Sequence, residues 1–105
     1  MDSFACLRAV ASALPEHRVD RADTAGALKR IFRNEDPAVV DQLVERSGVE
    51  VRHIALPLEE TLALTGFTER NAAWRLAALD LSQRAAASAL AAAGIAPSTI
   101  DLLID

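Results

Sequence analysis

The sequence of 105 residues has few of the residue types that build metal, disulfide and phosphate-loop sites. Its single cysteine excludes an intramolecular disulfide and a CxxC metal knuckle. Its two histidines, His17 and His53, are too far apart for a metal-binding pair on one helix turn. Its four glycines are scattered, so neither a Walker loop nor a dinucleotide-binding loop is present. We therefore expect no metal site and no bound cofactor.

Positive charge and long apolar runs are also scarce. Eleven Lys and Arg residues against fifteen Asp and Glu give a net charge of −4, which opposes binding to a nucleic-acid backbone. No uncharged apolar run is long enough to span a bilayer, and Asp2 stands where a signal peptide carries basic residues. The sequence predicts a soluble, cytoplasmic protein without nucleic-acid or membrane partners.

Aromatic residues make up only 4% of the chain, whereas alanine makes up about a fifth. The totals of 51% hydrophobic and 25% charged residues are those of a single globular domain. Because small side chains each bury little apolar area, the chain needs close packing against neighbouring elements to be stable.

The first half of the chain predicts strands and two short helices. A loose alternation over residues 6–14 predicts a mostly buried strand that stops at Pro15. Asp23 and Thr24 can cap a helix that runs through the apolar positions 27, 28, 31 and 32. A second helix is predicted with Asp36 as N-cap and Pro37 at its first position. Gly48, in the left-handed conformation, is expected to form its C-terminal cap. Its apolar stripe consists of Val39, Val40, Leu43 and Val44.

The second half is dominated by a long helix. Residues 49–56 favour an extended segment ended by Pro57, and residues 57–66 form a loop with one helical turn at 59–64. A helix over residues 68–93 is capped by Thr68 and ends in a Schellman motif at Gly94, where Ile95 can contact Leu90. The helix face expected to lie deep between other elements consists of Trp74, Ala77, Ala78, Leu81, Ala85, Ala89 and Ala92.

The last residues predict a turn at 97–99 and the opening of a strand at 100–105 that is apolar on both faces. Such strands belong in the middle of covered sheets, and the chain stops inside this one. We therefore expect residues 1–105 to be a partial N-terminal α/β domain, truncated within a central strand. A complete small domain with a C-terminal strand is the alternative.

No catalytic constellation is evident from the residues. Cys6 lies in an apolar segment without a base beside it, so we expect a buried structural thiol rather than a nucleophile. His17, expected in a turn, and His53, in the extended segment, are interpreted as structural or surface residues. Ser82 follows Asp80 and Leu81 in mid-helix, which does not match the serine of acyl-carrier proteins.

Two groups of charged residues are candidate sites, a pair of carboxylates and the basic residues of the first half of the chain. Glu59 and Glu60 are adjacent and face apart, so they are interpreted as a solvated face. The seven basic residues between positions 18 and 52 form either a local phosphate-binding patch or a set of solvated helix faces. They are Arg18, Arg21, Lys29, Arg30, Arg33, Arg46 and Arg52.

Four segments resemble a known family. Residues 14–19 read LPEHRV, residues 46–57 read RSGVEVRHIALP and residues 67–74 read FTERNAAW, and their order and spacing resemble the beginning of bacterial type III polyketide synthases, relatives of chalcone and stilbene synthases. Residues 89–104, ALAAAGIAPSTIDLLI, are similar to the thiolase superfamily generally, in which a helix leads into a central strand.

This resemblance implies an N-terminal fragment of a thiolase-like αβαβα fold whose full-length parent is a homodimer. It implies an acyltransferase that condenses a starter acyl-CoA with malonyl-CoA by decarboxylative Claisen chemistry. The family's catalytic Cys, His and Asn would lie beyond residue 105, so the fragment is expected to be inactive, and Cys6 does not match the nucleophile's motif.

The resemblance also suggests one binding residue. In plant members, basic positions in the helix before a Ser-x-x-x-x-Arg stretch, here residues 47–52, help to hold the phosphates of CoA. Arg46 matches one such position, whereas Val39 and Gln42 replace the other two and lack the charge. The rival interpretations are a fragment of a condensing enzyme like ketoacyl synthase III and a non-catalytic interaction module that pairs through the alanine face of the long helix.

Overall fold

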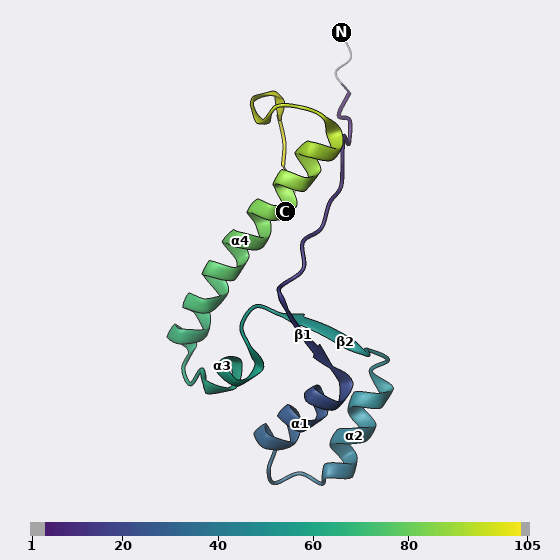
Figure 1. Cartoon of the computed structure of the whole chain (residues 1–105), viewed down its shortest axis with the longest axis vertical. Coiled ribbons are helices and arrows are strands. Elements are labelled where there is room, and N and C mark those ends of the chain that lie inside the picture. The colour runs from purple at the N-terminus through teal and green to yellow at the C-terminus, as the bar shows by residue number, and fades with distance from the viewer. Residues whose placement is uncertain (1–3, 104–105) are drawn as a thin grey trace. The chain divides into compact units, whose positions relative to one another are not determined.

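The computed structural model describes residues 4–103 and has a mixed α/β structure of helices and one small sheet (Figure 1). The chain divides into two compact units, which are described separately. The ribbon unit is Pro15–Trp74, and the helical unit is formed by residues 4–14 together with residues 75–103.

The ribbon unit contains a two-stranded antiparallel ribbon. β1 (His17–Asp20) pairs with β2 (Val51–Ile54), with His17 opposite Ile54 and Asp20 opposite Val51. β2 lies inside the predicted extended segment 49–56, but the placement of His17 in a turn is wrong. A strand of four residues is too short to show a clear alternation, and its pairing with a distant segment decides its conformation.

The first helix, α1 (Arg21–Ile31), follows β1 without a connecting residue. Its N-cap is Asp20, whose carboxylate accepts a hydrogen bond from the backbone N–H of Asp23 at 2.8 Å. The Thr24 hydroxyl donates to the Asp20 carbonyl oxygen, also at 2.8 Å. The predicted cap at Asp23 and Thr24 is therefore wrong, because both residues lie in the first turn that Asp20 closes.

The second helix, α2 (Pro37–Arg46), has the predicted ends. Asp36 is the N-cap and accepts from the backbone N–H of Ala38 at 2.9 Å, Pro37 is the first residue, and Gly48 has a φ of +68°. α1 packs against α2 and against β1 (Figure 1). The buried side chains described in this unit are Val19, Ala27, Val40 and Val44.

A short helix, α3 (Leu58–Ala63), replaces the predicted single turn, and the long helix is α4 (Phe67–Ala93). α4 begins one residue before Thr68, which therefore lies inside the first turn and is not the predicted cap. The predicted C-terminus is confirmed, since Gly94 has a φ of +65° and the N–H of Ile95 bonds to the Leu90 carbonyl at 3.4 Å. This pairing defines a Schellman motif.

The helical unit has no buried side chain among its described residues. Residues 4–14 form an extended segment beside α4, and Arg84 donates to the Leu14 carbonyl at 3.3 Å (Figure 1). The predicted buried strand over 6–14 is wrong, because this segment has no strand partner in the described chain and Leu7 and Val10 are each 79% exposed.

The predicted deep burial of α4 is also wrong. Most of the predicted face is half-buried, but Trp74, the last residue of the ribbon unit, is 66% exposed. The predicted turn is a 3-10 helix, η1 (Pro97–Thr99). Residues 100–103 of the predicted strand are exposed and unpaired, and Ile104 and Asp105 lie outside the described residues.

Candidate functional site

Arg46 is the last residue of α2, and its side chain is exposed. Within the described chain, its guanidinium takes part in no hydrogen bond or ion pair. A helix C-terminus carries partial negative charge, so the helix itself does not attract an anion here. A phosphate at this position would therefore be held by the guanidinium, which can bind two phosphate oxygens at once.

Most of the other basic residues of the ribbon unit already have partners. Lys29 and Asp41 form an ion pair at 2.7 Å. Arg21 lies 3.9 Å from Glu50, and the Arg33 Nε donates to the Arg30 carbonyl at 3.1 Å. Because carboxylates neutralise much of the positive charge, the structure does not assemble the predicted group of seven cations into one phosphate-binding patch.

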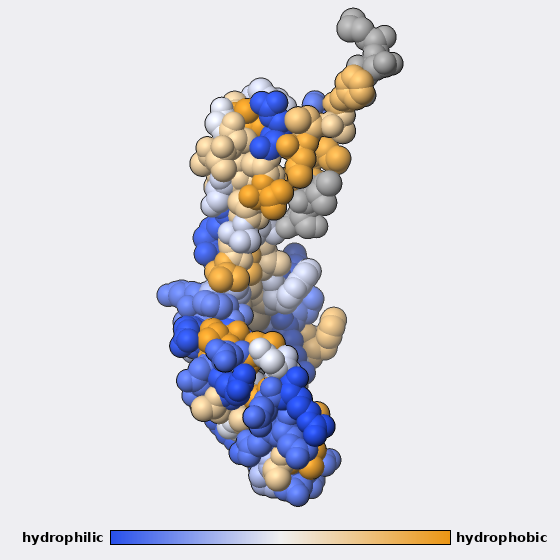
Figure 2. All heavy atoms as spheres, turned by 90° about the vertical axis from the view of Figure 1, so that its right-hand side faces the viewer, coloured by the Kyte–Doolittle hydropathy of each residue, from blue (hydrophilic) through white to orange (hydrophobic). Residues whose placement is uncertain are grey.

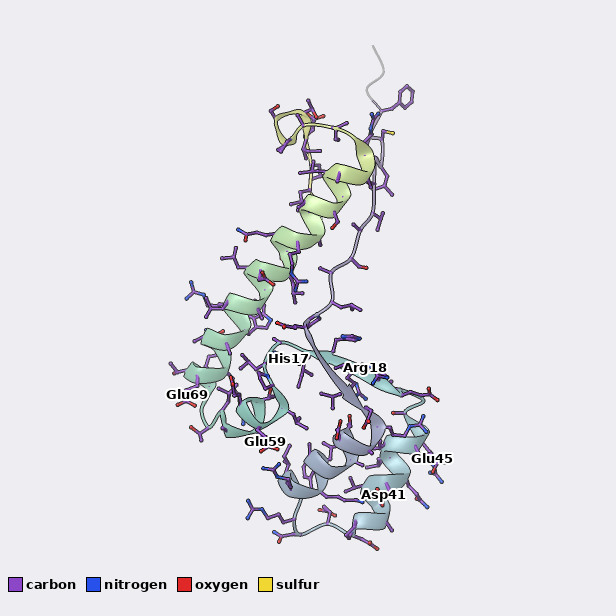
Figure 3. The ribbon with its side chains drawn as sticks, viewed as in Figure 1. His17, Arg18, Asp41, Glu45, Glu59 and Glu69 are labelled. Atoms are coloured by element: carbon purple, nitrogen blue, oxygen red, sulfur yellow. The ribbon has the colours of Figure 1, made fainter. Side chains whose placement is uncertain are left out.

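Arg18 and Arg52 lie on the ribbon but do not form a pair. Arg18 is opposite His53 and Arg52 is opposite Val19, so the two arginines occupy opposite faces. Figure 3 shows Arg18 on β1, Asp41 and Glu45 on α2, and Glu59 on α3. Arg46 therefore remains the basic residue of α2 on which a phosphate site can be built.

Arg30 and Glu59 form a two-pronged ion pair between α1 and α3. The guanidinium nitrogens lie 2.7 and 3.1 Å from the two carboxylate oxygens. These hydrogen bonds and the opposite charge lower the pKa of Glu59 and raise the pKa of Arg30. Glu59 is thus more than part of a solvated face, whereas Glu60 is exposed and has no ion pair in the described chain.

An apolar groove lies where α1 ends and α2 begins. Its volume is about 240 Å³, and it is lined by Phe32, Glu35, Val39, Val40 and Leu43. The sequence places Val39 and Leu43 in the apolar stripe of this helix, and in the structure they are 46% and 64% exposed. The groove was missed because it depends on how two helices pack, although the wide apolar stripe of α2 was a usable signal.

The other candidate residues are dispersed. Cys6 is exposed in the extended segment, which contradicts the expected burial, because no strand forms around it. His17 and His53 lie on β1 and β2, where the His53 Nδ1 is 3.2 Å from the Pro15 carbonyl oxygen. Ser82 lies inside α4.

Two kinds of site are not found in the part of the chain that the structure describes. Residues 4–103 contain no group of three metal-ligating side chains. Among the same residues, no helix combines the length and apolar character that crossing a membrane requires.

Comparison with curated proteins places the chain among the relatives of bacterial type III polyketide synthases, which confirms the resemblance found in the sequence. The match lies in the N-terminal part of those proteins. The chain spans little more than a quarter of the length of the curated relatives it matches. No protein-family model and no solved structure matches the chain.

Three relatives illustrate the match. The 1,3,6,8-tetrahydroxynaphthalene synthase of Streptomyces peucetius subsp. caesius is 36% identical over 106 residues, which cover 99% of this chain and 28% of that protein. The synthase of the same name from Streptomyces griseus is 33% identical over 95 residues, covering 90% and 26%. The phloroglucinol synthase of Pseudomonas fluorescens is 28% identical over 91 residues, covering 86% and 26%.

Proposed function

We propose that the chain is a partial N-terminal thiolase-like domain of a type III polyketide synthase, truncated within a central strand. The parent is a cytoplasmic homodimeric acyltransferase that condenses a starter acyl-CoA with malonyl-CoA by decarboxylative Claisen chemistry. The observation that carries this proposal is the 36% identity to a tetrahydroxynaphthalene synthase over 99% of the chain. Residues 4–103 bring no catalytic constellation together, and we expect the 105 residues alone to be inactive because the family's catalytic residues would lie beyond residue 105.

We assign Arg46 to the binding of a CoA phosphate. Its guanidinium is exposed and has no protein partner in the described chain, so binding a phosphate breaks no existing ion pair. Val39 and Gln42 carry no charge, so α2 offers one cation where the resemblance implies three. The affinity for CoA through this helix therefore depends on Arg46 and on contacts other than charge.

The test uses the native protein, captured from its source cells with an antibody to residues 1–105. We expect an intact mass several-fold above 11.2 kDa and release of free CoA from malonyl-CoA when a starter acyl-CoA is present. A mass of 11.2 kDa without CoA release would overturn the proposal and favour the interaction module. Turnover of carrier-bound malonate instead of malonyl-CoA would indicate an enzyme like ketoacyl synthase III.

The role of Arg46 is tested in the same assay. Arg46→Gln removes the positive charge, and we expect KM for malonyl-CoA to rise about tenfold while kcat changes little, because a ground-state contact is lost. Arg75→Gln is the matched control, since Arg75 is also an exposed helical arginine without an ion pair in the described chain. An equal effect of both variants would remove Arg46 from the site.

A further inference from the structure

The outer edge of β2 is open in the ribbon unit. The sheet consists of β1 and β2, so each strand has one neighbour in the described chain. Apart from the ladder with β1, residues 50–54 make no backbone hydrogen bond in that part of the chain. Arg52 and His53 are exposed. Such an edge presents N–H and C=O groups that can pair with another extended segment.

The residues along this edge carry alternating charge. Glu50 immediately precedes β2 and Arg52 is its second residue, so in an extended chain the two side chains share one face. Arg52 has no hydrogen bond or ion pair in the described chain. The Glu50 side chain is 84% exposed, and its contact with Arg21 is long, at 3.9 Å. Both charges are therefore available to a partner.

β2 stops at Val51 because its neighbour turns away. Asp20 is the last residue of β1 and pairs with Val51, and Arg21 already belongs to α1, so β1 offers no residue opposite Glu50. A strand on the outer edge is not limited in this way. Pairing on that side can extend β2 to include Glu50.

An antiparallel copy of the same segment matches these charges. When a two-fold axis passes through the sheet between two facing Val51 residues, Glu50 of each copy lies opposite Arg52 of the other. Opposite charges at facing positions stabilise a strand pair, and like charges destabilise it. Moving the axis by one residue places Glu50 or Arg52 opposite its own copy. The charges therefore favour the register centred on Val51.

We propose that β2 pairs antiparallel with β2 of a second copy of this chain, centred on Val51, so that two ribbons form one four-stranded sheet. Both copies contribute the same surface, so the contact is completed by two chains. This pairing goes beyond the proposed synthase activity and does not depend on it. It is also separate from dimerisation of the parent through any other surface.

The outer edge of β1 is less suited to the same contact. Arg18 and Asp20 also carry opposite charges two residues apart, but the Asp20 carboxylate accepts from the Asp23 N–H at 2.8 Å. Val19, which would lie at the centre of the contact, is only 5% exposed. β1 therefore cannot offer both charges without giving up the cap of α1, and the sheet ends at this strand.

The first experiment tests the register by crosslinking the protein at its native length. Facing residues of antiparallel strands have Cβ atoms about 4.5–5.5 Å apart, so mild oxidation of Val51→Cys should join two chains by a disulfide. Mass spectrometry of the linked peptides identifies the bond. Val49→Cys is the matched control, because its two thiols would lie about 13 Å apart along the strands. Equal yields at both positions, or no disulfide at position 51, would overturn the proposal.

The second experiment exchanges the charges and measures association by sedimentation velocity. Glu50→Arg and Arg52→Glu each place like charges opposite each other, so we expect each variant to associate about tenfold more weakly than the unmodified protein. In an equimolar mixture, one variant has two positive and the other two negative residues at these positions. Every facing pair is then opposite in charge, so the mixture should associate as strongly as the unmodified protein.

This recovery separates strand pairing from a loss of folding, because a misfolded variant would not be rescued by the other. Glu60→Arg is the control for net charge, since it makes the same change at an exposed residue of α3 and should leave association unaltered. A mixture that associates no better than the separate variants would overturn the proposal. So would an unmodified protein that does not self-associate.

Discussion

The ribbon unit and the helical unit use apolar side chains in different ways. In the ribbon unit, α1 packs against α2 and β1, and Val19, Ala27, Val40 and Val44 are buried. In the helical unit, the described residues include large apolar side chains such as Leu76, at 73% exposed, but none that is buried. Figure 2 shows a largely hydrophilic surface over α1 and α2 and a more hydrophobic one over the helical unit.

The difference shows that a helix can form from local sequence signals alone, whereas a core requires other elements packed against it. α4 runs for 27 residues because it is rich in alanine and closed by a Schellman motif, both of which are local properties. A core requires elements on both sides of a helix, and the part of α4 that belongs to the helical unit, residues 75–93, has one extended segment beside it. Local signals therefore define the body and the C-terminus of this helix without giving it a hydrophobic core.

The largest expected effect comes from placing a charge in the core of the ribbon unit. Val40 is 5% exposed, so Val40→Asp buries an unpaired carboxylate and should destabilise this unit by about 3–5 kcal/mol. Val39→Asp is the control, because Val39 is 46% exposed and the new charge can be hydrated. Hydrogen exchange of the α2 amides measures the loss, and equal effects of both changes would mean that the unit has no core at Val40.

A smaller effect is expected at the two glycines with positive φ. Gly48→Ala forces a left-handed conformation on alanine and should destabilise the ribbon unit by about 1–2 kcal/mol. Gly94→Ala carries the same strain in the helical unit and should leave exchange in α2 unchanged. Gly26→Ala is the opposite control, since Gly26 lies inside α1 in open space and its replacement should stabilise that helix by about 1 kcal/mol.

If Gly94→Ala accelerated exchange in α2 as much as Gly48→Ala, the two units would unfold together. The presence of a core in the ribbon unit and its absence in the helical unit would then not make the two units unfold separately.

The smallest effect is the acid sensitivity of the link between α1 and α3. Arg30 lowers the pKa of Glu59, so the stabilisation is present above the ordinary value of 4.5 and is lost as the pH falls through the lowered pKa. Because the pair is exposed, we expect only a slight fall in the urea midpoint of the ribbon unit over this acid range.

Glu59→Gln should make the urea midpoint less dependent on pH in that range. Glu60→Gln is the matched control, because the neighbouring carboxylate has no ion pair in the described chain. A midpoint that depends on pH in the same way in the unmodified chain and in Glu59→Gln would show that the ion pair does not contribute to the stability of the ribbon unit.

The sequence predicts an element well where the signals lie within a few residues of its ends. Asp36, Pro37 and Gly48 define α2, and Gly94 ends α4, because capping depends on local hydrogen bonds and backbone conformation. β1 was missed because its conformation depends on pairing with β2, and no local pattern reports that pairing. The predicted strand at 6–14 failed for the same reason, since it has no partner in the described chain.

The candidate site also contains one residue that the sequence identifies and features that only the packing of separate elements reveals. Arg46 was identified through a resemblance of sequence segments, and its exposure is consistent with a binding role. The groove beside it was missed because Phe32 and Glu35 come from the end of α1 and the following turn, whereas Val39 and Leu43 come from α2. Ion pairs such as Arg30 with Glu59 join residues from different helices, so composition alone could not show which cations remain available.

Asp20 has a role in β1 and a role in α1, because the helix begins at the residue that follows the strand. It pairs with Val51 as the last residue of β1, and its carboxylate caps α1. A slip of the ribbon by one residue would turn every side chain of β1 to the other face, and because α1 follows β1 directly it would also shift α1 against α2. The register of the ribbon and the packing of the first two helices therefore depend on each other.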